Sequence, residues 1–144
     1  MSEFERVWNE IGGSNIMTLS TCADNRVTSR QMSVVTINGR FYCQTNKNYL
    51  KCRQIAQNPN VSLCFGKFVV EGSCREIGRP YDNLTFIQAI GNAFPDAVKR
   101  WSGISEDCLL EISPTLIRSW IYENNVPYIE IWDIEHNDYR KERQ

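Results

Sequence analysis

Two basic residues, Arg30 and Lys51, have the types and positions that best suit a chemical role in this sequence. Arg30 lies in a strand-like segment, where an arginine must pair with an anion or reach solvent because an isolated buried charge is costly. Lys51 falls in the first turn of a short expected helix, where free backbone N–H groups and the helix dipole favour an anion. Together the two side chains could hold one phosphate group. The alternative for each residue alone is a surface charge paired with Asp or Glu.

A set of polar residues accompanies these cations along the same part of the chain. Its members are Ser29, Gln31, Ser33, Gln44 and Thr45. Hydroxyl and amide groups of this kind can bind the polar parts of a ligand, but each is equally an ordinary solvated strand residue. The residues therefore predict a polar, cationic site in which no catalytic acid or base is assigned.

Composition and missing motifs exclude several classes of function. The 144 residues carry 16 Lys and Arg against 17 Asp and Glu, and a net charge of −1 argues against broad binding to nucleic acid. His136 is the sole histidine, so multi-histidine zinc sites and histidine-based triads are excluded and no metal site is expected. The sequence contains no dinucleotide-binding, P-loop or nucleophile-elbow motif. No apolar run approaches the ~20 residues that span a bilayer, so no membrane contact is expected.

The six cysteines favour a reducing compartment. They form no C-x-x-C pair, and residues 1–10 are charged, unlike the apolar core of a secretion signal. We therefore expect a cytoplasmic protein in which the thiols are free and mostly buried.

The hydrophobic pattern predicts hairpin-connected strands with a few helices inserted. Helices are expected over residues 3–12, 49–57 and, broken near Pro95, 81–103. Strands are expected over residues 16–22, 27–37, 40–45, 61–65, 67–77, 108–122 and 128–134. Asn38-Gly39 favours a type I′ turn, and Pro114 is expected to mark a bulge or an edge. The charged residues 136–144 predict a loosely ordered tail.

This order of elements indicates one domain, residues 1–144, of the α+β class. The strands are expected to be mainly antiparallel and to form a closed or partly closed barrel with peripheral helices. A chain of about this length buries roughly 70% of its unfolded surface, so the core requires neither disulfides nor a metal. Trp120 and Trp132 are more often core or interface residues than cofactor stackers, and on adjacent long strands they suit a dimer face.

One part of the sequence resembles a known family. Over about residues 16–72, the segments SRQMSVV and GRFYCQTNKNYLKCRQIAQNPNVSLCF are similar to the pyridoxamine 5′-phosphate oxidase-like family of FMN-binding split barrels. The spacing of Thr45-Asn46, Lys51 and Asn58-Pro59-x-Val61 is the most specific part of the match. The resemblance, closest to small general-stress-protein members, implies a six-stranded split barrel that works as a homodimer with FMN at the interface.

The resemblance also implies which residues contact FMN. Arg30 would reach its phosphate or ribityl region, Lys51 would bind the phosphate, and residues 31–35 would run beside the flavin. Gln44 and Thr45 would contact the isoalloxazine or the ribityl chain, and Lys67 could face the polar edge of the flavin. The implied cofactor-binding set is Ser29, Arg30, Gln31, Met32, Ser33, Gln44, Thr45, Lys51 and Lys67. The chain departs from the family at Tyr49-Leu50, where a Ser-Arg pair is usual. Each charge-assisted hydrogen bond lost there would weaken binding by roughly 1.5–3 kcal/mol.

The resemblance implies an FMN-dependent oxidoreductase that acts on a small-molecule redox substrate. Oxidation of pyridoxamine phosphate itself is not expected, because HNDYRKERQ stands where the true oxidases carry an Arg- and Trp-containing segment. The alternative is a non-catalytic split-barrel module for binding or stress response, with weak or no affinity for FMN. One thiol near a flavin could be redox-active.

Overall fold

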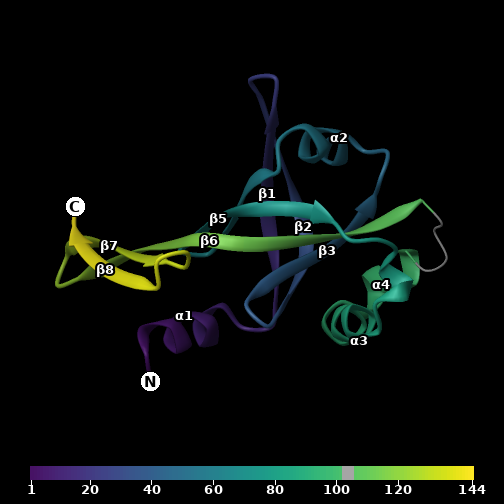
Figure 1. Ribbon diagram of the computed structural model, residues 1–144. Coiled ribbons are helices and arrows are strands. Elements are labelled where there is room, and N and C mark those ends of the chain that lie inside the picture. Colours follow the sequence, from purple (N-terminus) through teal and green to yellow (C-terminus); the bar gives the residue numbers. More distant parts are fainter. Residues whose placement is uncertain (102–105) are drawn as a thin grey trace.

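Tight turns join many of the strands and set their antiparallel pairing. Asn38 and Gly39 both have positive φ, as a type I′ turn requires. The pairs Asp24-Asn25 and Asn124-Asn125 also have positive φ at both residues. The computed structural model describes residues 1–101 and 106–144, and its eight strands form one sheet (Figure 1). The strands are β1 (Ser14–Ala23), β2 (Arg26–Ile37), β3 (Arg40–Asn46), β4 (Asn60–Phe65), β5 (Phe68–Glu76), β6 (Asp107–Glu123), β7 (Val126–Asp133) and β8 (Asp138–Arg143).

Six of these strands close into a ring. The sheet order is β3-β2-β1-β4-β5-β6-β7-β8, and an additional pairing between β3 and β6 completes the ring. The 17-residue strand β6 makes this possible, because its first part pairs with β3 while its later part extends to β7. Strands β7 and β8 form an arm outside the ring (Figure 1). The predicted α+β class and six-stranded split barrel are confirmed.

Strands β5 and β6 lie very close to each other at Gly72. The register of the ladder shifts just before Gly72, so Thr115 is the extra residue of a bulge next to Pro114. A Cβ atom on Gly72 would lie 2.4 Å from the backbone oxygen of Ser113. The bulge expected at Pro114 is therefore confirmed, and the close approach requires glycine.

The helices lie around the ring and agree with the sequence pattern. They are α1 (Glu3–Ile11), α2 (Leu50–Gln57), the short 3₁₀ helix η1 (Pro80–Asp82), α3 (Leu84–Ala93) and α4 (Pro95–Trp101). The helical stretch expected over residues 81–103 is broken before Pro95 as predicted, and its residues 102–103 lie outside the described residues. None of the described helices is long and apolar enough to cross a membrane.

Two hydrophobic clusters stabilise this arrangement. The larger fills the ring and extends under α1 and α2, with Met17, Leu19, Phe41 and Leu63 among its fully buried members. The smaller cluster packs Phe86 and Ile90 of α3 against the outer side of the ring. The ring is thus a filled core, and a polar ligand must bind at its ends or outer surface.

The C-terminal segment corrects the prediction of a loose tail. Residues Asp138–Arg143 form β8, paired along its length with β7. The ring of Tyr139 lies 5.3 Å from that of Trp132, and its hydroxyl donates to Glu130. This aromatic contact and the ladder of backbone hydrogen bonds order a segment whose charged composition alone suggested disorder.

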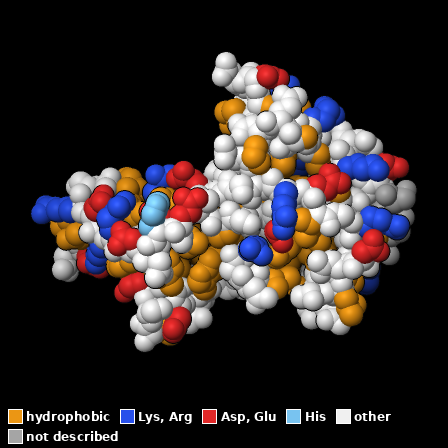
Figure 2. All heavy atoms as spheres, viewed as in Figure 1, with side chains coloured by type: hydrophobic (Ala, Val, Ile, Leu, Met, Phe, Trp, Pro, Cys, Tyr) orange, Lys and Arg blue, Asp and Glu red, His pale blue; other side chains and the backbone are white. Residues whose placement is uncertain are grey.

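Trp132 belongs to the core, so its assignment to a dimer face is wrong. It is fully buried, and its indole N–H donates to the carbonyl of Glu3 in α1 at 3.1 Å. Trp120 on β6 is 53% exposed and remains available for an interface. On the face shown in Figure 2, basic and acidic side chains are interspersed.

Candidate functional site

Arg30 points into one end of the ring. Side chains alternate along β2, and the guanidinium of Arg30 donates to the carbonyl of Leu19 at 3.2 Å and to Thr21 Oγ1 at 2.8 Å. It also donates to the hydroxyl of Thr28. Burial lowers the pKa of Arg30 below its usual value. The neighbours of this cation are therefore neutral acceptors on β1 and β2.

Lys51 enters the same region from α2. The chain turns after β3 and begins α2 at Leu50, which puts Lys51 in the first turn with only 8% of its surface exposed. Its ammonium donates to Thr45 Oγ1 at 2.8 Å and lies 4.9 Å from the centre of the Tyr49 ring. A cation held by a hydroxyl and an aromatic face is not neutralised by a carboxylate.

The two cations act on each other. Burial lowers the pKa of Lys51, and the positive charge of Arg30 lowers it further. Among residues 1–101 and 106–144, no carboxylate forms an ion pair with either side chain. Two neighbouring cations without a carboxylate partner form a site suited to a small dianion such as a phosphate ester.

A network centred on Gln54 holds α2 over this end of the ring. Its carbonyl oxygen accepts hydrogen bonds from Thr21 at 2.5 Å and Thr28 at 2.7 Å, and its amide donates to the carbonyl of Arg26 at 3.1 Å. The sequence alone predicted no role for Thr21, Thr28 or Gln54. The available signal was that Thr28 lies two residues from Arg30, on the same face of the strand.

The other residues expected on β2 divide between two faces. Ser29, Gln31 and Ser33 alternate with Arg30 and lie on the outer side, where the Ser29 hydroxyl is 2.8 Å from that of Ser20. Met32 shares the inner face and packs against the core. The structure therefore brings Arg30, Thr45 and Lys51 together and leaves the β2 serines and Gln31 on another surface.

Gln44 and Lys67 have partners of their own. The amide of Gln44, which is 7% exposed, donates to Asp107 Oδ2 on β6 at 2.6 Å. Lys67 lies in the turn between β4 and β5, and its ammonium is 2.9 Å from Glu10 Oε2. Glu10 belongs to α1, which lies away from α2 (Figure 1). Lys67 is therefore separate from the Arg30–Lys51 site within one chain.

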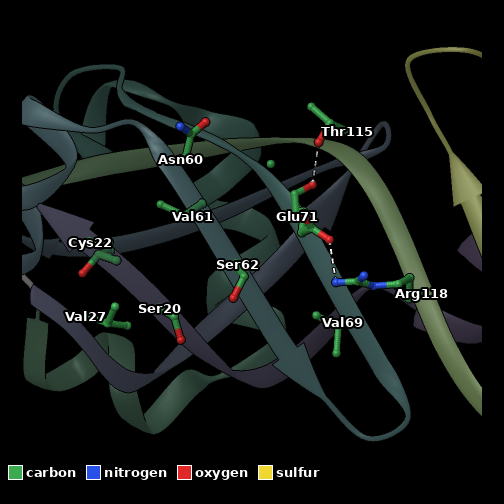
Figure 3. A pocket seen from close by; sticks show the side chains of 12 residues that line it. Ser20, Cys22, Val27, Asn60, Val61, Ser62, Val69, Glu71, Thr115 and Arg118 are labelled. Carbon is green, nitrogen blue, oxygen red and sulfur yellow. Dashed lines mark hydrogen bonds and ion pairs between the residues drawn. The ribbon is translucent and has the colours of Figure 1, made fainter. Parts of the chain in front are cut away.

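An open groove of about 470 Å³ lies on the outer surface of β1, β4, β5 and β6, with Val27 of β2 at its edge. Figure 3 shows its polar rim, where Arg118 is 2.6 Å from Glu71 and Thr115 donates to the backbone of Glu71 at 3.2 Å. None of its lining residues belongs to the predicted cofactor set. It includes Thr21, which also accepts from Arg30, so the groove adjoins the cationic site.

Comparison with known proteins agrees with this fold. The family model for pyridoxamine 5′-phosphate oxidase matches residues 4–121. The chain therefore belongs to the pyridoxamine 5′-phosphate oxidase-like family, which confirms the resemblance. No curated protein matches the sequence significantly.

Solved structures support the same conclusion at the level of the fold. General Stress Protein 26 from Bacillus anthracis str. Sterne matches with a TM-score of 0.64 and 24% identity, covering 81% of this chain and 92% of that one. A pyridoxamine 5′-phosphate oxidase-related, FMN binding protein from Nostoc punctiforme PCC 73102 matches with a TM-score of 0.60 and 14% identity, covering 89% of this chain and 85% of that one. The heme storage protein from Vibrio cholerae matches with a TM-score of 0.57 and 16% identity, covering 68% of this chain and 80% of that one. Proteins similar to this chain thus bind different ligands.

Proposed function

We propose that this protein binds FMN, with the phosphate held between Arg30 and Lys51. The observation that carries the proposal is a lysine only 8% exposed, beside an arginine, with no carboxylate partner in the described part of the chain. A phosphate dianion would neutralise both charges and accept their hydrogen bonds. The FMN-binding relative from Nostoc supports the choice of ligand.

The first turn of α2 supports the same assignment. Tyr49 makes no side-chain cap, so backbone N–H groups at the start of the helix are available to a bound phosphate. The Tyr49-Leu50 departure removes a hydroxyl and a guanidinium that the family usually supplies. The ring of Tyr49 contributes a cation–π contact to Lys51 instead, and this contact positions the ammonium.

The bound FMN would carry out electron or hydride transfer, whereas the protein would bind and orient it. We therefore assign the protein as an FMN-dependent oxidoreductase acting on a small molecule, with no catalytic residue named. Its six free cysteines support a reducing, cytoplasmic setting. The heme storage relative makes a non-catalytic binding module the competing assignment.

We further propose that two copies associate, with FMN at their interface. The exposed aromatic residues Trp120 and Tyr122, at 53% and 67% exposure, support a contact surface on β6. A second chain would also cover the outer face of β2, where Ser29, Gln31 and Ser33 lie.

The phosphate assignment is tested by replacing Lys51 and comparing FMN with riboflavin, which lacks the phosphate. Lys51→Met is expected to weaken FMN binding by about 10-fold or more, because a charge-assisted hydrogen bond contributes roughly 1.5–3 kcal/mol. Riboflavin binding is expected to change little. Quenching of flavin fluorescence measures both affinities.

Lys141→Met is the matched control, because it removes the same type of charge from β8, where the ammonium binds Glu123. It should leave both affinities unchanged. Equal losses of FMN and riboflavin in Lys51→Met would show that Lys51 does not contact the phosphate. If the wild type binds neither flavin, the non-catalytic module becomes the better assignment.

A further inference from the structure

Two cysteines meet directly beside the cationic site. The Sγ atoms of Cys52, in the first turn of α2, and Cys108, near the start of β6, lie 3.9 Å apart. A disulfide has an S–S length of about 2.05 Å, so the two thiols are in contact but not bonded. The contact joins segments that are 56 residues apart in the sequence. Rotation of the side chains would have to close a gap of about 2 Å.

The two thiols differ in their surroundings. Cys108 is 1% exposed, whereas Cys52 is half-buried and lines a cavity of about 230 Å³ together with Cys74, Arg75 and Glu76. A small oxidant that enters this cavity therefore meets Cys52 first. Cys108 lies behind it, within reach of its sulfur.

The charges around the pair favour a thiolate on Cys52. A hydrogen bond from the Cys108 thiol lowers the pKa of Cys52, and the nearby cations Lys51 and Arg30 lower it further against the opposing effects of burial and Glu76. The same hydrogen bond, together with burial, raises the pKa of Cys108. Cys52 is thus the nucleophile of the pair, and Cys108 keeps its proton.

The neighbouring cysteines do not share these properties. Burial raises the pKa of Cys43 to about 12, and it raises the pKa of Cys74 as well. Cys64 is exposed, and Cys22 is half-buried on the outer side of β1. Only the Cys52–Cys108 pair, among the six thiols of the described residues, combines contact between sulfurs with an accessible member.

We propose that Cys52 and Cys108 form a peroxide-sensitive dithiol that closes to a reversible disulfide. The Cys52 thiolate attacks one oxygen of hydrogen peroxide, the O–O bond breaks, and the departing hydroxide takes a proton to become water. The Cys108 thiol then attacks the resulting sulfenic acid, forming the S–S bond and releasing a second water. Two thiols lose two electrons in total, and one peroxide gains them.

The inference concerns a second chemistry of the protein and does not depend on FMN. The bridge would tie the first turn of α2 to β6, next to Lys51. A thiol reductant would reverse it by exchange.

The test treats the full-length protein with hydrogen peroxide, blocks the remaining thiols and maps the peptides by mass spectrometry without reduction. The wild type should yield a crosslink between the peptides of Cys52 and Cys108, with a mass lower by two hydrogen atoms, and dithiothreitol should remove it. Cys64→Ser, which replaces an exposed thiol, should form the same crosslink.

Single substitutions separate the roles of the two sulfurs. Cys108→Ser should trap a sulfenic acid on Cys52 that dimedone labels, and Cys108→Ala serves if the serine variant does not fold. Cys52→Ser should leave Cys108 reduced. The proposal is overturned if both wild-type thiols remain free after peroxide, if the crosslink joins other cysteines, or if dimedone labels Cys52 equally in the wild type and in Cys108→Ser.

Discussion

Lys51, the proposed phosphate ligand, carries a charge that is costly to bury in the free protein. Its ammonium is 8% exposed and faces the charge of Arg30 without a carboxylate in the described residues to offset either. The pKa of Lys51 is lowered first by burial and then by Arg30, so folding penalises its charged form. This penalty is present below the folded-state pKa of Lys51, is lost as the pH rises through that pKa, and is absent above the pKa of the unfolded lysine.

We therefore expect Lys51→Met to equal or exceed the wild type in free energy of unfolding when no flavin is present. The advantage should shrink as the pH is raised from 7 toward 10.5, because the wild-type lysine then loses its charge. Urea unfolding at several pH values measures this. A clear loss of stability at neutral pH would mean that Lys51 is a structural residue.

Glu111 makes the free energy of unfolding depend on pH in the acid range, and folding favours its charged form, whereas folding penalises the charged form of Lys51. This side chain is 6% exposed, and burial tends to raise its pKa, but hydrogen bonds from Arg75 and Tyr42, both at 2.9 Å, bring the pKa below its usual value. The stabilisation is present above the unfolded pKa and is lost as the pH falls through the folded one.

Glu111→Gln should cost about 1–3 kcal/mol at pH 7, because it weakens a buried, charge-assisted network. It should also make the fall in stability below pH 5 shallower than in the wild type. Glu142→Gln, on exposed β8, is the control and should behave like the wild type in urea unfolding. Parallel pH profiles for all three proteins would contradict the role of Glu111.

The residues of the site were partly predictable from the sequence. The convergence of Arg30 and Lys51 follows from a cation on a strand face and another at a helix start, and the structure brings both together. Ser29 and Gln31 were grouped with Arg30 by sequence proximity, although alternation along β2 directs them to the opposite face. Thr21 and Gln54 depend on tertiary contacts, which single-sequence reasoning does not provide.

At the scale of elements, turns and hydrophobic periodicity predicted most of the fold. The Asn38-Gly39 turn and the helices over α1, α2 and α3 agree with the sequence pattern. Strand β8 was missed because its order comes from the contact of Tyr139 with Trp132 and from pairing with β7. The charged composition of a short edge strand resembles that of a disordered tail.

The bulge between β5 and β6 requires glycine at position 72, and a substitution there tests this requirement. Gly72→Ala places a methyl group 2.4 Å from the backbone oxygen of Ser113, so the strands must separate. We expect a loss of about 1–3 kcal/mol in the free energy of unfolding.

Gly91→Ala in α3 is the matched control, because a Cβ there meets nothing within 4 Å. It should raise helix stability by up to about 1 kcal/mol. Thermal or urea unfolding distinguishes the two variants. Equal stability of Gly72→Ala and the wild type would show that β5 and β6 do not need this close approach.

At the scale of the whole molecule, the later part of β6 continues from the ring to the arm of β7 and β8 and exposes Trp120. If two copies associate through this surface, Trp120→Ser should shift the protein toward monomer in sedimentation velocity at micromolar concentration. Leu84→Ser, at an apolar residue that is 69% exposed on α3, should leave the association unchanged. A wild type that sediments as a monomer would contradict the dimer.

We propose that the cationic end of this split barrel binds the phosphate of FMN. The most direct measurement is a titration of a fixed FMN concentration with the wild-type protein, followed by flavin fluorescence. We predict saturable quenching with an endpoint of one FMN per chain, and weaker quenching with riboflavin. Unchanged FMN fluorescence at a large excess of protein, or equal affinity for the two flavins, would contradict it.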